Sequence, residues 1–127
     1  MDLTTPLNRV LGLGAAKTGS EHWWMQRLTA IALLPLGLWF AISLLLLDDF
    51  AYATVVTWVQ RPLTGIMLVL TVLAVGYHSH MGVQVVIEDY VHATASKVVA
   101  LILSALAHFG LTVAALFAIL KVAFTSV

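Results

Sequence analysis

Cysteine is missing from this 127-residue chain, which excludes disulfides, thiolate-bound metals and iron–sulfur clusters from what the chain supplies by itself. Charged residues are also scarce: they make up 9% of the sequence, and the formal net charge is zero. That balance argues against nucleic acid, or an anionic lipid surface, as the main binding partner. With so few charges there is no polar shell, so a water-soluble domain is excluded.

What is present is apolar surface. Hydrophobic residues make up 61% of the chain, and the mean hydropathy is +1.02. The sequence therefore predicts an integral membrane protein. Because a span needs about 20 residues, the length allows three helices and no separate soluble catalytic domain. We expect an all-α, three-helix bundle forming one transmembrane domain over residues 1–127, with spans at about 25–47, 63–87 and 98–120.

The segments around these spans carry weaker signals. Residues 1–21 read as a surface-lying arm without a secretory signal, so we expect the first span to be retained as an anchor. Pro35 predicts a kink in the first span. Residues 50–60 are expected to form a short loop or an interfacial helix, and residues 88–97 a polar bridge between the second and third spans.

The basic residues near the spans are unevenly distributed. On the amino-terminal side lie Arg9, Lys17, Arg27 and Lys97, and on the opposite side lie Arg61 and Lys121. Loops with more lysine and arginine stay inside the cell. The sequence therefore predicts a cytoplasmic amino terminus and a periplasmic carboxyl terminus.

The stretch 77–92 holds most of the chemistry, because it places two histidines at membrane depth. An ionisable side chain within a span is a functional hypothesis by default. His78 and His80 are two residues apart, hence about 200° apart around a helix, and cannot bind one metal from the same face. Gly82 lies one turn after His78, where its missing side chain lets a flat macrocycle or a neighbouring helix approach.

Axial ligation of haem is the functional interpretation of these histidines, because imidazole is an established haem ligand and no cysteine competes. Gly82 favours His78 over His80, and His108 in the third span is a further candidate. Each of the three histidines can instead serve packing, through hydrogen bonds between helices.

At the end of the second span, Asp89 and Tyr90 follow Glu88, and Arg27 lies at the start of the first span. Asp89, Tyr90 and Arg27 can form a hydrogen-bonding rim around a polar head group. They can equally be topological anchors at the membrane surface.

Two stretches resemble a known family. His78, Gly82, Gln84, Val85 and Asp89-Tyr90-Val91, together with residues 26–33, are similar to the hydrophobic membrane anchor of succinate dehydrogenase (respiratory complex II), the small subunit that bears one haem b ligand. The spacing from histidine through glycine to Asp-Tyr is the more specific of the two signals.

The resemblance implies that the chain is not catalytic alone but belongs to a quinone-reducing complex. Its implied partners are a second anchor subunit of the cytochrome b556 type, an iron–sulfur subunit, a flavoprotein subunit and the lipid bilayer, with no nucleic acid. The implied location is the bacterial inner membrane, in preference to the mitochondrial one.

The resemblance also implies roles for single residues. The residue matching His78 is an axial ligand of haem b, whose second ligand comes from the other anchor chain. The residue matching Arg27 lies near the haem propionates. The residue matching Tyr90 hydrogen-bonds a ubiquinone carbonyl, with the aspartate matching Asp89 beside it. His80 and His108 match no motif position.

Two other functions compete. One is a self-contained haem-binding electron carrier that uses His78 and His108 of a single chain. The other is a structural anchor without a cofactor. A transporter is disfavoured, because the sequence has no inverted repeat and no pair of broken helices.

Overall fold

Every element of secondary structure within residues 19–125, the part that the computed structural model describes, is a helix. Three of the four helices are long and apolar enough to cross a membrane: α2 (Gly19–Leu45), α4 (Pro62–Tyr90) and α5 (Thr94–Phe124). The prediction of an all-α protein with three spans is therefore confirmed. Most of the predicted arm 1–21 lies outside the described residues.

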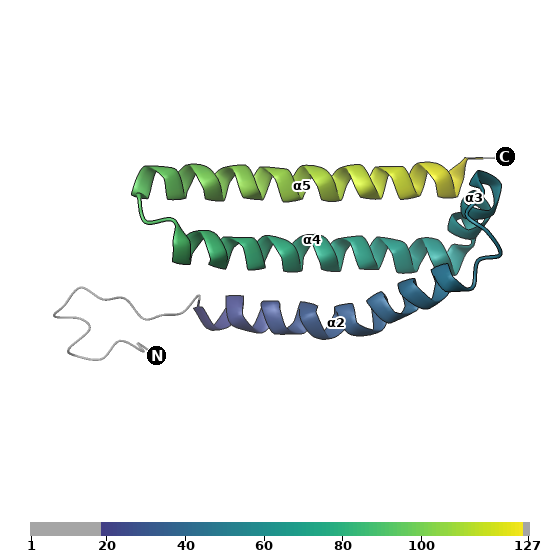
Figure 1. Cartoon of the computed structure of the whole chain (residues 1–127), viewed down its shortest axis with the longest axis horizontal. Helices are drawn as coiled ribbons and strands as arrows, with labels where there is room; N and C mark the ends of the chain where they lie inside the picture. The colour runs from purple at the N-terminus through teal and green to yellow at the C-terminus, as the bar shows by residue number, and fades with distance from the viewer. Residues whose placement is uncertain (1–18, 126–127) are drawn as a thin grey trace, which may run out of the picture.

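The three long helices lie side by side in one layer (Figure 1). α4 packs along both α2 and α5, whereas α2 and α5 do not contact each other within residues 19–125. The sequence predicted a bundle, and the difference has a physical reason. Lipid tails solvate leucine as well as a neighbouring helix does, so burial of apolar surface does not force the layer to close.

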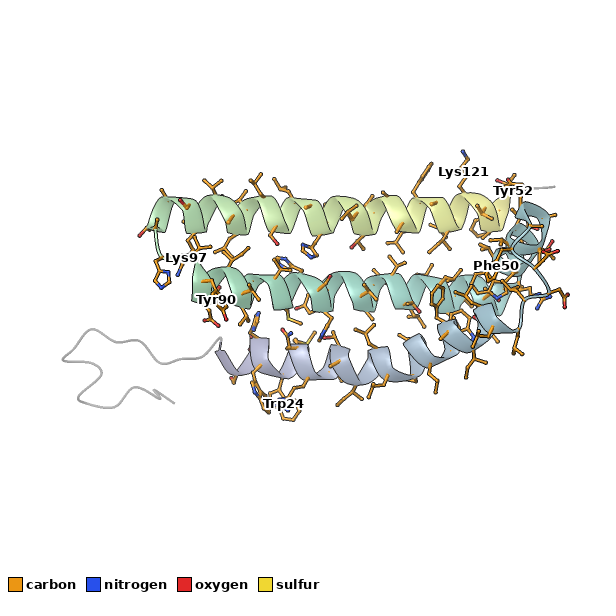
Figure 2. All side chains as sticks on the ribbon, viewed as in Figure 1. Trp24, Phe50, Tyr52, Tyr90, Lys97 and Lys121 are labelled. Carbon is orange, nitrogen blue, oxygen red and sulfur yellow. The ribbon has the colours of Figure 1, made fainter. Side chains whose placement is uncertain are left out.

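Side chains accordingly point outward along the whole layer (Figure 2). Among the described residues, the buried hydrophobic side chains are Val56, Trp58, Leu68 and Met81. Backbone polar groups are satisfied within each helix, as the bilayer requires. The layer thus leaves broad apolar faces for lipid or for other helices.

α2 bends along its length, so that its second half turns toward the short helix at the far end of the layer (Figure 1). Pro35 lies inside α2. Proline has no N–H to donate to the preceding turn, and its ring clashes with the carbonyl four residues earlier, which bends a helix. The bend agrees with the kink predicted from Pro35.

The far end of the layer is closed by α3 (Tyr52–Gln60), which shows that residues 50–60 are mostly helical. Before it, Asp49 Oδ1 accepts a hydrogen bond from the Ala51 amide at 3.0 Å. Hydrogen bonds from the Thr54 side chain and the Ala51 amide lower the pKa of Asp49 below its ordinary value. Gln60 Nε2 donates to Thr125 O at 2.8 Å and so ties α3 to the end of α5.

α4 and α5 approach closely near their middle. A Cβ added to Gly76 would collide with the Thr112 hydroxyl of α5. At the other end of the pair, the helices are joined by residues 91–93, and Lys97 Nζ donates to Glu88 O at 2.8 Å. The predicted polar bridge 88–97 is therefore mostly helical, with a short turn at its centre.

Candidate functional site

His78 faces α2, where it meets Thr29. The Thr29 Oγ1 atom lies 3.1 Å from His78 Nδ1, and both side chains are partly buried. Gly82 follows one turn after His78, and Asp89 follows after three turns. Eleven residues of an α-helix make three turns plus about 20°, so Asp89 lies within about 20° of the azimuth of His78. One face of α4 therefore joins the histidine to the acidic end of the helix.

An open groove of about 480 Å³ runs along this face between α2 and α4. It is lined by His22, Trp23, Gln26, Gly82 and Val85. A Cβ on Gly82 would approach Gln26 Nε2 to 3.7 Å, which is ordinary contact. The neighbours in this chain therefore do not require glycine, but the missing side chain keeps the groove open.

Two side chains of the groove have buried polar atoms without a hydrogen-bond partner: Nε2 of His22 and Oε1 of Gln26. Buried polar groups are normally paired, so each unpaired atom calls for a partner. His22 and Gln26 are one turn apart on α2, and Thr29 continues their stripe. Sequence analysis missed both residues, although the spacing 22, 26 and 29 is a helical stripe that could have pointed to them.

His80 lies on the other side of α4 and faces α5. Its ring centroid is 5.5 Å from that of His108, and both line a cavity of about 320 Å³. His108 Nδ1 lies 2.8 Å from Ser104 O, which can only accept, so Nδ1 carries the proton. The predicted separation of His78 and His80 onto different faces is confirmed.

This arrangement contradicts the single-chain electron carrier. That hypothesis requires His78 and His108 to bind one haem from opposite sides. In the structure, His78 contacts α2, whereas His108 packs against His80 on the α5 side of α4. α4 itself separates the two histidines.

The predicted rim residues are brought to one end of the layer but not into mutual contact. The Arg27 guanidinium stacks on Trp23, with Cζ 4.1 Å from the ring centroid. Tyr90 is 77% exposed at the end of α4, near Lys97 (Figure 2). Glu88 accepts a hydrogen bond from Gln84 Nε2 at 2.8 Å. Among residues 19–125, no hydrogen bond joins Arg27 to Asp89 or Tyr90.

A larger cavity, of about 530 Å³, lies at the opposite end, among α2, α3 and the start of α4. It contains Asp48, Arg61 and Trp58 but none of the residues predicted to form a site. The smaller groove is the better candidate, because its residue Gly82 lies one turn from His78 and because it contains two of the three unpaired buried side-chain atoms of the described residues. In the described part of the chain, no group of three or more histidine, aspartate or glutamate side chains could hold a metal ion.

Three apolar helices, with a groove at one end that contains His22 and Gln26, define the class of this protein: a multi-pass membrane subunit with a candidate ligand face between α2 and α4. Residues 1–124 match the family model of the succinate dehydrogenase/fumarate reductase transmembrane subunit. The chain belongs to that family. It is a membrane anchor subunit of succinate dehydrogenase.

Individual relatives agree. The chain is 36% identical over 91 residues to the succinate dehydrogenase hydrophobic membrane anchor subunit of Rickettsia bellii, covering 71% of this chain and 72% of the relative. It is 32% identical over 90 residues to the membrane anchor subunit of Reclinomonas americana, covering 68% and 75%. It is 26% identical over 121 residues to the anchor subunit of Paracoccus denitrificans, covering 95% and 93%.

No solved structure matches the chain significantly. With three apolar helices and relatives in Rickettsia and Paracoccus, the chain is a multi-pass protein of a bacterial inner membrane.

Proposed function

We propose that this anchor subunit holds one side of a haem b through His78 and forms part of a ubiquinone site with Asp89 and Tyr90. The observation that carries the haem assignment is the pairing of His78 Nδ1 with Thr29 across the α2–α4 interface. A ligating histidine typically uses its second ring nitrogen for such a hydrogen bond. His78 is one turn from Gly82 of the groove, and its hydrogen bond reaches a different helix, whereas His108 Nδ1 bonds Ser104 of its own helix.

The groove suits a flat, partly polar group. Gly82 leaves room beside the histidine, and His22 Nε2 and Gln26 Oε1 offer buried polar atoms that need partners. Arg27 stacks on Trp23, which lines the groove, and would turn toward an acidic substituent of the bound group. A bound haem b would supply a one-electron redox centre at this face.

A haem b held at this face would receive one histidine ligand, His78, from this chain. His22 also reaches the groove, but it lies seven residues from Thr29 on α2, or about 10 Å along the helix axis. It is therefore too far along the groove to share an iron atom with His78. The second axial ligand would come from another anchor subunit, of the cytochrome b556 type, packed on this open layer.

The quinone assignment rests on the end of α4. Asp89 and Tyr90 are both exposed there, one on the stripe of His78 and the other beside it. A carboxylate and a phenol offer a proton acceptor and a hydrogen-bond donor at the membrane surface. A quinone head needs both, while its isoprenoid tail needs the apolar faces that the layer exposes.

The same end of the layer would dock the iron–sulfur and flavoprotein subunits. Arg27 and Lys97 lie at this end, and Arg61 and Lys121 at the other. The two ends are therefore balanced within the described residues, and Arg9 and Lys17 give the amino-terminal side its excess of positive charge. That excess supports a cytoplasmic amino terminus and a periplasmic carboxyl terminus.

The test is a pair of histidine variants in the assembled complex. We expect His78→Ala to abolish or displace the haem b signal in the reduced-minus-oxidised spectrum. We expect His80→Ala, two residues away on the opposite face, to leave that signal nearly intact. Equal spectra for wild type and His78→Ala would remove His78 as a ligand and favour an anchor that contributes no haem ligand.

A further inference from the structure

Thr29 holds an unusual position in the hydrogen bonding of α2. Its Oγ1 atom lies 2.8 Å from Met25 O and 3.1 Å from Gln26 O, in the preceding turn of its own helix. The same atom lies 3.1 Å from His78 Nδ1 of α4. One hydroxyl oxygen therefore has three polar neighbours, two on its own helix and one across the α2–α4 interface.

The chemistry of these neighbours decides the direction of each bond. A hydroxyl has one proton to donate and two lone pairs to accept with. The Met25 carbonyl can only accept, and it is the nearest of the three neighbours, so it receives the Thr29 proton. The oxygen then faces His78 with a lone pair, and the His78 Nδ1–H donates to it.

The tautomer of His78 follows from that direction. A neutral imidazole carries one proton, so a proton on Nδ1 leaves Nε2 with its lone pair. No hydrogen-bond acceptor within residues 19–125 is placed at Nε2, which is the arrangement a ligand nitrogen needs. The opposite tautomer would leave an Nε2–H without a partner at membrane depth.

We propose that Thr29 is a positioning residue for the haem ligand: its hydroxyl accepts the Nδ1–H of His78, orients the ring, and keeps the Nε2 lone pair available to iron. This inference rests on the proposed ligand role of His78. It adds a residue on a different helix, so the α2–α4 contact itself becomes a condition for ligation. A partner on the second ring nitrogen also makes an imidazole a better electron donor to the metal.

The chain offers variants that separate the hydroxyl from the shape of the side chain. Thr29→Val keeps the branched shape and removes the hydroxyl, whereas Thr29→Ser keeps the hydroxyl and removes the methyl group. Thr71→Val is the matched control on α4, because the Thr71 hydroxyl also bonds the preceding turn, at 2.7 Å from Met67 O. No hydrogen bond from Thr71 to another helix is found in the described residues.

The readouts are haem loss and midpoint potential, not turnover. Purified complex is mixed with excess apomyoglobin as haem acceptor, and the haem remaining is counted per flavin, so that only assembled complex contributes. Loss of such a supporting hydrogen bond typically weakens metal binding tenfold to a hundredfold. We expect Thr29→Val to lose haem roughly tenfold to a hundredfold faster than wild type. Its haem potential should shift positive, because the imidazole donates less to ferric iron.

Serine and the control give the opposite expectation. Thr29→Ser and Thr71→Val should retain the wild-type rate of haem loss and the wild-type potential. If Thr29 served packing alone, Thr29→Ser would lose haem faster than Thr29→Val, because valine preserves the branched shape and serine does not. If Thr29→Val yields no complex, Thr29→Cys replaces it, because a thiol of similar size is only a weak acceptor.

Each outcome decides the proposal. A wild-type rate of haem loss and a wild-type potential in Thr29→Val would overturn the role of Thr29. If His78→Ala then contained no haem, His78 would remain the ligand. Serine failing as badly as valine would overturn the role as well, in favour of packing. Wild-type haem in His78→Ala would overturn the ligand assignment and this inference together.

Discussion

Two tyrosines at opposite ends of the layer show what a single residue contributes. Tyr90 at the end of α4 is 77% exposed, and Tyr52 at the start of α3 is 85% exposed (Figure 2). The two tyrosine side chains are thus similarly exposed, and either one suits the role of an interfacial anchor. Only Tyr90 adjoins Asp89 and the stripe that leads to His78.

Tyr90→Phe should therefore slow quinone reduction, because it removes a hydrogen-bond donor while keeping the ring. A lost hydrogen bond of about 1 to 3 kcal/mol corresponds to a roughly fivefold to hundredfold fall in quinone turnover. The measurement is succinate oxidation by the same membranes with ubiquinone or with an artificial dye that accepts electrons upstream. The dye-dependent rate should be unchanged.

Tyr52→Phe is the matched control and should alter neither rate. Unchanged quinone turnover in Tyr90→Phe would return Tyr90 to the role of an interfacial anchor. A parallel fall of the quinone and dye rates would instead indicate failed assembly of the complex.

His78, Gly82 and Asp89 were predictable from the sequence, because helical geometry fixes which residues share a face. His22 and Gln26 were not found as groove residues, because their importance lies in the absence of a hydrogen-bond partner. An unpaired atom is a property of the packed structure, since it depends on what the neighbouring helix presents.

At the scale of helices, the contact between α4 and α5 depends on a small residue. Gly76 lets the Thr112 side chain lie directly against the α4 backbone. Small residues at such positions allow helices in membranes to approach closely. Threonine is stiff at its first side-chain torsion, so it has few ways to move aside.

Gly76→Ala should therefore destabilise the α4–α5 pair by about 1 to 3 kcal/mol, the usual cost of overpacking. The measurement is the thermal stability of the detergent-solubilised complex. Gly110→Ala on α5 is the control, because a Cβ there meets nothing within 4 Å. Equal stability of the two alanine variants would show that α5 yields to the extra methyl group without loss.

The bend of α2 is the second feature at this scale. Pro35 made a kink predictable, but its direction was decided by packing. The bent half of α2 brings Trp39 to a stacked contact with Trp58 of α3, with ring centroids 6.3 Å apart. α2 therefore contributes to both ends of the molecule: its first half lines the groove, and its second half meets α3.

At the scale of the whole molecule, the layer is open on both faces, and its described core is small. Such a chain is expected to complete its packing with the other subunits of its complex. Membership of the succinate dehydrogenase/fumarate reductase family fits this, because an anchor subunit works within a larger assembly.

The orientation of the whole chain in the membrane can be tested with reporter fusions. A reporter that folds only outside the cytoplasm should be active when fused after Val127. A reporter that works only inside should be active when inserted in the 91–93 turn, given the excess of basic residues on the amino-terminal side. The opposite pattern would place Asp89 and Tyr90 outside and would contradict the quinone assignment as well.

The sequence by itself determined that this protein crosses the membrane three times as helices. Hydropathy is a local property, and within lipid every backbone polar group must be satisfied inside its own helix, so long apolar runs leave no other choice. The spacing of residues also separated His78 from His80, because azimuth around a helix follows from counting.

Only the tertiary structure decided which helices meet and what each histidine touches. It placed α4 between α2 and α5, paired His78 with Thr29, and set His80 against His108. The reason is that lipid and protein solvate apolar side chains about equally, so helix order depends on a few small and polar groups that fit one another. Such a fit depends on two segments far apart in the chain, and neither segment encodes it alone.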